Sequence, residues 1–239
     1  MNIDQTLLSS LNALVADKGA WFHIFSALGN NPFIRGLPIF ASLAIVLSAS
    51  QSPAAKSRIF LGLCGVFLAL VVSVWCQTNV HLHLRPIFDS NVHIKDVLNW
   101  RALRPSFGER IYSFPSDTAA CYFAISTIIF LQNRRLGLLC YGWNVLTVGL
   151  CRVAMGSHYP SDIAGGLLLG AVCVYGPGRI PLLQRHVAAV LEKYRWSDTA
   201  YNIFILIFAA EAYSLFPGVQ EIYFFLVRLI HGNVTWLGA

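Results

Sequence analysis

The stretch CRVAMGSHYPSD, residues 151–162, places an Arg, a His and an Asp between two long apolar runs. A helix that begins after Pro160 would carry Asp162 in its first turn, where the carboxylate could reach back to the His158 ring and fix its tautomer. The other imidazole nitrogen would then be free to attack an electrophile. Six positions before His158, Arg152 offers a planar fork of donors that suits phosphate oxygens. The stretch predicts a phosphate handled by a nucleophilic histidine at a membrane surface.

The composition indicates a membrane protein. The 239 residues are 56% hydrophobic and 12% charged, and their mean hydropathy is +0.60, which is too apolar for a soluble domain of this size. The formal net charge is +6, but the basic residues are dispersed and form no block interleaved with exposed aromatics. We therefore expect contact with anionic membrane lipids and no binding of nucleic acid.

The apolar segments predict an all-α, polytopic bundle of five to six transmembrane helices, because about 20 residues cross the hydrocarbon core. Five segments are expected at residues 33–49, 59–80, 117–131, 136–153 and 162–180, and a sixth at residues 200–216. Gly166 and Gly170 would let the fifth helix pack closely on a neighbour. Residues 1–31 predict a surface-lying interfacial segment whose apolar positions face lipid tails. Residues 32–180 would form the membrane domain, and residues 181–239 a C-terminal extension with an extra transmembrane helix.

The basic residues also predict how the chain is oriented. They occur in the short links after the first and third segments and again after the fifth segment: Lys56, Arg58, Arg134, Arg135, Arg179, Arg185, Lys193 and Arg195. The positive-inside rule makes that side cytoplasmic. The loops 80–116 and 152–161 would then share the opposite, extracytoplasmic face of the membrane. The loop 80–116 also carries basic residues, but long loops obey the rule poorly.

Three segments meet on that face: Leu-Arg-Pro at 84–86, Phe-Pro-Ser-Asp-Thr-Ala at 114–119, and the Arg-to-Asp stretch at 152–162. This layout resembles the type 2 phosphatidic acid phosphatase (PAP2) superfamily of membrane lipid phosphatases. The family pattern is Lys-x6-Arg-Pro, then Pro-Ser-Gly-His, then Ser-Arg-x5-His-x3-Asp. The resemblance covers about residues 30–180 and is nearest to the bacterial undecaprenyl-diphosphate phosphatase branch, which often has Pro-Ser-Asp-His-Ala as its middle motif.

The resemblance implies a role for each matching residue. His158 would be the nucleophile that accepts the phosphoryl group, and Asp162 its orienting carboxylate. Arg85 and Arg152 would bind the phosphate oxygens. Ser116 and Asp117, with the backbone amides at the start of the third helix, would complete the phosphate site, since helix N-termini suit anions. We expect no cofactor and no metal, since no carboxylate or thiol shares a ligand-like spacing with His81, His83 and His93.

The chain departs from the family pattern at two important positions. Thr78 stands where the first motif has its Lys, and Thr118, which we count with the catalytic residues, stands where the middle motif has its His. Cys151 for Ser is a milder change. In the family the middle His is understood to protonate the leaving group, and a threonine hydroxyl cannot act as a general acid near neutral pH. The hydrolysis of an ordinary monoester is therefore in question.

Three compensations remain open. A diphosphate substrate has a phosphate as its leaving group and needs less protonation. Alternatively, a histidine of the outer loop could donate the proton (His81, His83 or His93), and Lys95 or Arg104 could replace the missing cation. Finally, the phosphoryl group could pass to an acceptor other than water.

The sequence therefore predicts a membrane lipid phosphatase or phosphotransferase. It would act on a lipid phosphate or diphosphate, with polyprenyl diphosphate as the preferred candidate, through a phosphohistidine intermediate. One alternative is a transferase that moves a phosphoryl or glycosyl group to a saccharide or lipid acceptor. Another is a protein that binds lipid phosphates without turnover.

Overall fold

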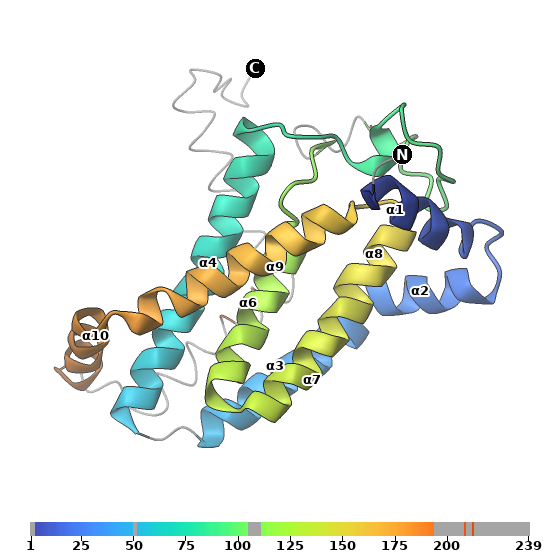
Figure 1. Ribbon diagram of the computed structural model, residues 1–239. Helices are drawn as coiled ribbons and strands as arrows, with labels where there is room; N and C mark the ends of the chain where they lie inside the picture. Colours follow the sequence, from blue (N-terminus) through green and yellow to red (C-terminus); the bar gives the residue numbers. More distant parts are fainter. Residues whose placement is uncertain (1–2, 50–51, 105–110, 194–207, 209–211, 213–239) are drawn as a thin grey trace, which may run out of the picture.

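The computed structural model describes residues 3–49, 52–104, 111–193, 208 and 212. In this part of the chain the regular structure is helical, apart from an isolated antiparallel bridge between Leu84 and Tyr112 (Figure 1). The elements in chain order are α1 (Ile3–Ala13), α2 (Ala20–Asn30), α3 (Pro32–Ala49), α4 (Pro53–Asn79), the 3₁₀ turn η1 (Pro86–Phe88), α6 (Asp117–Gln132), α7 (Arg134–Asn144), the π-helical segment η3 (Val145–Leu150), α8 (Cys151–Ala154), α9 (Pro160–Tyr175), the 3₁₀ turn η4 (Pro177–Arg179) and α10 (Pro181–Lys193).

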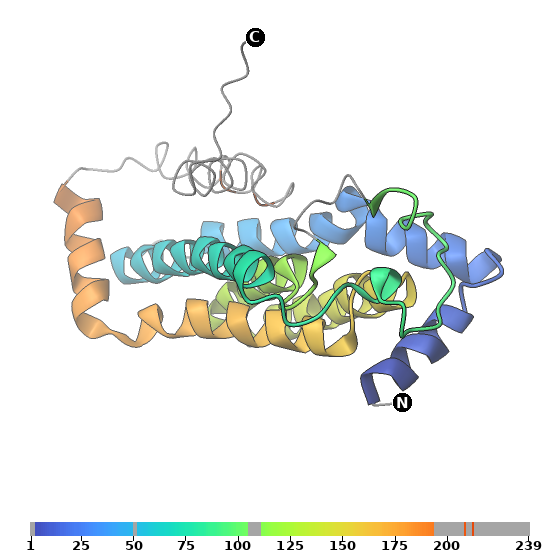
Figure 2. The same cartoon turned by 90° about the horizontal axis from the view of Figure 1, so that it is seen from above.

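The predicted all-α membrane bundle is confirmed, and each of the first five apolar segments forms a helix. By length and composition, α3, α4 and the continuous helix from Arg134 to Ala154 can cross a membrane. The pair α9 and α10, bent by 78°, would give a fourth span if counted as one, and α6 is apolar but has 16 residues. Figure 2 shows α10 turned across the end of α9. Helix α9 ends at Tyr175 rather than at residue 180 because Gly176 and Pro177 follow directly, and the chain passes through the turn η4 before it bends into α10.

Polar and apolar side chains are distributed as in a protein surrounded by lipid. Large apolar residues on the outer helix faces are exposed, including Leu139 on α7 (72%) and Leu168 on α9 (63%). Buried polar side chains lie inside the bundle: Ser73, Gln77, Ser126, Asn144 and Thr147. The protein is therefore an integral membrane protein.

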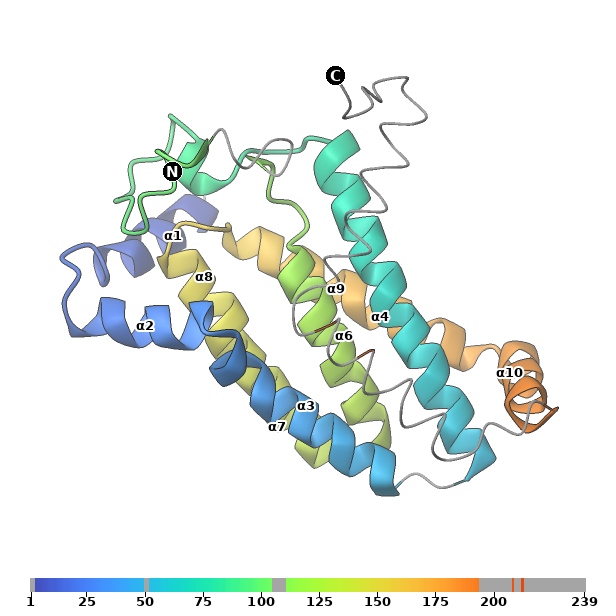
Figure 3. The same ribbon diagram turned by 180° about the vertical axis from the view of Figure 1, so that it is seen from behind.

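Helix α6 is the centre of the bundle and packs against α9, α4 and α7, while α3 packs on α6 and α7 from behind (Figure 3). Every residue of α6 from position 118 to position 129 is buried. A Cβ added at Gly166 would lie 2.6 Å from the Ser116 carbonyl oxygen, and one at Gly170 would lie 2.4 Å from the Ala120 carbonyl oxygen. The two glycines thus let α9 touch the backbone of α6, which confirms their predicted packing role.

The N-terminal segment is attached to the bundle more firmly than its sequence suggests. Leu8 of α1 is fully buried in the protein core, so not all of its apolar positions face lipid. The Ser161 hydroxyl and backbone N–H, at the start of α9, both donate to the Asp4 carboxylate. The Asn12 side chain donates to the Ala154 carbonyl at 2.9 Å. The interfacial position of residues 1–31 stays a prediction.

The predicted extra helix at residues 200–216 and the rest of the C-terminal extension lie outside the described residues, apart from α10 and the isolated positions 208 and 212. The boundaries at residues 31 and 180 also stay predictions.

Candidate active site

The three predicted motifs lie at the same end of the bundle, where α4 ends, α6 begins and α8 passes into α9 (Figure 1). Ser73 and Gln77 near the end of α4 both donate to the Pro115 carbonyl, at 2.8 and 2.7 Å. The Ser116 N–H donates to the Asp162 carbonyl at 3.0 Å, which joins the start of α6 to the start of α9. The Arg85 N–H donates to the Ile111 carbonyl at 2.8 Å, which brings the first motif to the second.

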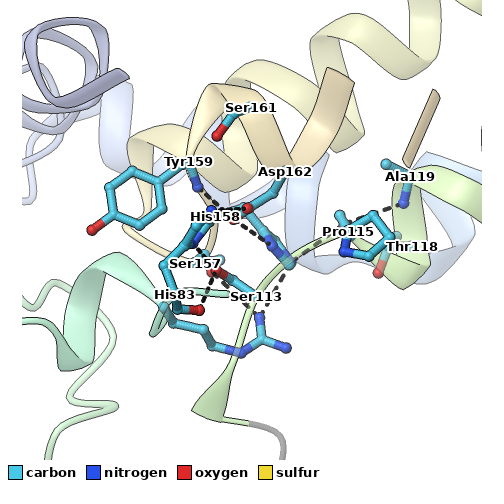
Figure 4. Close-up of polar contacts among 12 residues, drawn as sticks. His83, Ser113, Pro115, Thr118, Ala119, Ser157, His158, Tyr159, Ser161 and Asp162 are labelled. Carbon is cyan, nitrogen blue, oxygen red and sulfur yellow. Dashed lines mark hydrogen bonds and ion pairs between the residues drawn. The ribbon is translucent and has the colours of Figure 1, made fainter. Parts of the chain in front are cut away.

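His158 and Asp162 form the centre of the site, and both are fully buried. Helix α9 begins at Pro160, so Asp162 lies in its first turn and accepts a hydrogen bond from the Tyr159 N–H at 2.8 Å. The other contact of this carboxylate oxygen is to His158 Nδ1 at 3.4 Å (Figure 4). The two atoms are in contact, but the angle is not that of a hydrogen bond. Catalytic hydrogen bonds are often this long before substrate binds.

The opposite ring nitrogen of His158 faces a cation and a hydroxyl. Nε2 lies 3.2 Å from Nη1 of Arg85 and 3.4 Å from Oγ of Ser116. Arg85 Nη1 also donates to the Ser157 carbonyl at 3.3 Å, which orients the guanidinium. The Ser116 hydroxyl accepts from the Ala119 N–H at 3.3 Å, so it caps α6 and faces the histidine at once.

The electrostatic environment keeps the His158 ring neutral. Burial, and after it the neighbouring Arg85, together lower the pKa of His158 to about 4, against the opposing effect of Asp162. At neutral pH the ring thus has one N–H and one lone pair. With Asp162 facing Nδ1, the lone pair belongs on Nε2, beside the groups that would bind phosphate oxygens.

Arg152 and Asp117 lie at the edge of this arrangement. Arg152 stands in the last turn of α8, and its buried Nε atom has no hydrogen-bond partner among the residues that the structure describes. Asp117 begins α6, and its charge interacts with both Arg85 and Arg152. Because a carboxylate repels a phosphate, Asp117 would act on an anion only through these arginines.

The two threonines that replace family residues bond to their own helices. The Thr118 side chain is fully buried, and its hydroxyl and N–H both donate to the Asp117 carboxylate, at 3.3 and 2.7 Å. The Thr78 hydroxyl donates to the Val74 carbonyl one turn earlier in α4, at 3.0 Å. Neither contact supplies an acid or a cation to the site.

The three loop histidines have different surroundings. His83 reaches the site, since its Nε2 lies 3.4 Å from Oδ1 of Asp162. His81 packs against the ring of Tyr112, with the centroids 4.3 Å apart. His93 lines a cavity of about 840 Å³ between α1 and the loop that follows η1, together with the two basic residues proposed as substitutes, Lys95 and Arg104.

Sequence reasoning missed Arg35. This residue of α3 is buried, donates from Nη1 to the Gly29 carbonyl at 2.9 Å, and holds its guanidinium 5.1 Å from the centroid of Tyr122. Its positive charge reaches Arg152. The signal was present, because an arginine inside a predicted membrane span is costly unless it has a function or a partner.

No group of three or more His, Cys, Asp or Glu side chains is placed to hold a metal ion in the part of the chain that the structure describes. The groups that the site does bring together are a neutral imidazole and fixed cationic donors, which suit the transfer of a phosphoryl group.

Comparison with known proteins identifies the family. Residues 62–180, about half of the chain, match the model of the PAP2 superfamily, and the protein belongs to that superfamily. The predicted family is confirmed, and the matched segment contains all the predicted site residues.

Several curated proteins are similar to parts of the chain. The bacitracin transport permease protein BcrC of Bacillus licheniformis is 45% identical over 62 residues, which are 25% of this chain and 29% of that protein. The undecaprenyl-diphosphatase BcrC of Bacillus subtilis is 29% identical over 145 residues, which are 59% and 67% of the two chains. A lipid A 1-phosphatase of Rhizobium johnstonii is 39% identical over 62 residues, 25% of this chain and 24% of that protein. No solved structure is significantly similar to the chain.

Proposed function

We propose that this protein is a membrane lipid phosphatase that removes the terminal phosphate of a lipid diphosphate, with a polyprenyl diphosphate as the substrate. The observation that carries the proposal is the orientation of the His158 ring: Nδ1 faces the Asp162 carboxylate, while Nε2 faces Arg85 and Ser116. This is the arrangement that a nucleophilic imidazole needs. The membership of the PAP2 superfamily and the names of the similar phosphatases support it.

The reaction would have two steps. First, the Nε2 lone pair of His158 forms a bond to the terminal phosphorus, and the bond to the bridging oxygen breaks, so that polyprenyl phosphate leaves with that electron pair. Second, water attacks the phosphohistidine, the N–P bond breaks, and its electron pair returns to Nε2. Inorganic phosphate leaves, and the surplus proton of the water is released with it. Arg85, Arg152 and Ser116 would stabilise the charge on the phosphoryl oxygens in both steps.

The missing general acid favours a diphosphate over a monoester. A lipid alcohol is a poor leaving group and needs a proton, whereas a phosphate monoester departs as a stable anion. Thr118 bonds to Asp117 and cannot supply the proton. A diphosphate substrate thus fits the replacement of the motif-two His by Thr118.

The proposal includes an orientation in the membrane. The basic links at the start of α4 and between α6 and α7 lie at the end of the bundle opposite the site (Figure 1). If those links are cytoplasmic, the site faces the extracytoplasmic side of the bacterial inner membrane. The substrate would then be a lipid of the outer leaflet.

A phosphate-release screen with the purified protein tests the activity. The substrates are undecaprenyl diphosphate, undecaprenyl monophosphate, phosphatidic acid and phosphatidylglycerol phosphate, with His158→Ala as the blank. We expect release from the diphosphate and at least about tenfold less from the monoesters. Equal rates on monoester and diphosphate would contradict the leaving-group argument. If no phosphate is released and His158 carries no label, the protein binds lipid phosphates without turnover.

A second candidate is a phosphotransferase, which the substitution at Thr118 favours because an activated water is then harder to generate. Thr118→His would restore the family residue. A sharp rise in monoester hydrolysis would indicate that the native site disfavours water. Transfer of label to an added saccharide or lipid alcohol would identify the acceptor directly.

A further inference from the structure

His83 occupies a place in the site that the family motifs do not assign. It lies on the chain between α4 and η1, two residues before Arg85, and its ring faces Asp162 (Figure 4). The Asp162 carboxylate thus has an imidazole on each side: His158 near Oδ2 and His83 near Oδ1, each at 3.4 Å.

The carboxylate oxygen next to His83 needs a donor. Oδ1 of Asp162 is buried and has no hydrogen bond of good geometry in the described part of the chain, whereas Oδ2 accepts from the Tyr159 N–H. Buried carboxylate oxygens are normally satisfied, and an unsatisfied one is costly. The Nε2–H of His83 is the group placed to satisfy it.

The surroundings of His83 fix its ring in that direction. Nδ1 lies 3.1 Å from the Ser113 hydroxyl, whose oxygen is also 3.5 and 3.4 Å from the carbonyl oxygens of His83 and Leu84. When this hydroxyl donates to Nδ1, a neutral ring carries its proton on Nε2. The ring also packs edge-on against Tyr159, with the centroids 5.0 Å apart, and against Phe114 at 5.9 Å. The bridge between Leu84 and Tyr112 holds together the two chain segments that carry His83 and Ser113.

We infer that His83 is a positioning residue of the phosphoryl-transfer site, which holds the Asp162 carboxylate from the side opposite His158. A chain of contacts then runs from Ser113 through His83 and Asp162 to the nucleophile. The inference rests on the proposed function and adds a residue to its machinery. His83 does not take the place of the missing acid of the middle motif, because both of its nitrogens are already directed at Ser113 and Asp162.

Three variants test this role: His83→Ala, His83→Gln and, as a matched control from the same loop, His81→Ala. A glutamine amide can still donate to Asp162 but cannot transfer a proton. We expect His83→Ala to lower kcat for the lipid diphosphate about 10- to 100-fold, by analogy with the loss of groups that orient metal-bound histidines. KM should change less than about threefold, because His83 does not face the phosphate side of His158. His83→Gln should recover most of kcat, and His81→Ala should match the wild type.

Other outcomes would overturn the inference. If the kcat of His83→Ala equals that of the wild type, Asp162 does not need His83 to keep its position. His83→Gln as impaired as His83→Ala would show that the imidazole moves a proton instead. If His83→Ala does not fold, Ser113→Ala gives the answer: it should lower kcat in the wild type but have no further effect in the His83→Gln background. Equal effects in both backgrounds would contradict the contact chain.

The result is separable from that of the proposed function. If the wild-type protein is inactive and His158 is not labelled, both the proposed function and this inference are wrong. If the wild type is active and His83→Ala is equally active, only the inference is wrong.

Discussion

Helices α6 and α9 meet in two regions of different character. Along their length the contact is apolar and close, with Gly166 and Gly170 against the α6 backbone. At their first turns the same helices carry Ser116 and Asp162, which face the His158 ring. The close contact between the two helices therefore fixes where the polar groups stand. Changes along the helices should affect stability first, and changes at the first turns should affect activity first.

The largest effect is expected from His158→Ala. Removing the nucleophile should lower phosphate release at least about 10⁴-fold and abolish the acid-labile phosphoprotein. Its thermal midpoint in detergent should stay within a few degrees of that of the wild type, as expected for a change at the first turns. Rapid-quench labelling with a terminally labelled diphosphate gives the measurement. If this variant still becomes labelled, a residue other than His158 is the nucleophile.

Asp162→Asn should follow with a loss of about 10³-fold in kcat. The amide oxygen can still accept from the Tyr159 N–H and start α9, but it cannot stabilise the charged imidazole or hold its tautomer as a carboxylate does. The thermal midpoint serves as the control for folding. Activity within tenfold of the wild type would separate Asp162 from the chemistry.

Gly170→Ala tests the other region. The added methyl group would lie 2.4 Å from the Ala120 carbonyl oxygen, so the helices must separate, at a cost of about 1–3 kcal/mol in the free energy of unfolding. Gly142→Ala on α7 is the matched control, because a Cβ there meets nothing within 4 Å. Thermal unfolding in detergent should show a lower midpoint only for Gly170→Ala. Equal midpoints would mean that the contact between α6 and α9 is looser than described.

The smallest effect is expected from mild acid. Since the pKa of His158 is lowered to about 4, only about a tenth of the rings should be protonated at pH 5, whereas an ordinary histidine would be almost fully protonated. An NMR titration of the ring, assigned with His158→Ala, gives the measurement. A midpoint near 6.5 would contradict the buried, arginine-flanked environment.

The same shift has a consequence for folding. The pKa of His158 is lower in the folded than in the unfolded protein, so protons bind the unfolded chain more readily between pH 6.5 and 4. The stability that the neutral ring contributes is fully present above pH 6.5 and is lost as the pH falls toward 4.

Much of the fold could be predicted from the sequence because apolar length alone identifies spans. The segment 117–131 coincides with α6 almost to the residue, and the segment 33–49 with α3. The π-helical turn between α7 and α8 has no comparable signal, because no proline or glycine pair marks it. The packing of α1 on α9 through Asp4 could not be predicted either, since it joins residues 157 positions apart.

The candidate site divides in the same way. Arg152, His158 and Asp162 are near in sequence, so helix geometry predicts their proximity. Arg85 and Ser116 are far from His158 in sequence, and their place in the site could be predicted only from the resemblance of their motifs to those of the family. The contact of His83 with Asp162 depends on the path of the loop between α4 and α6 and on the bridge between Leu84 and Tyr112. Spacing alone therefore left His83 equivalent to His81 and His93.

The two hydrogen bonds from α4 to the Pro115 carbonyl fix the rotation of this helix about its own axis. Ser73 and Gln77 are four residues apart and therefore share one face of α4. One extra residue anywhere earlier in the helix would rotate both donors by about 100° away from that carbonyl, whereas four extra residues would bring them back to within about 40°. Insertions into α4 before Ser73 should therefore be tolerated only when they add about a whole helical turn, because both donors must still face the Pro115 carbonyl oxygen.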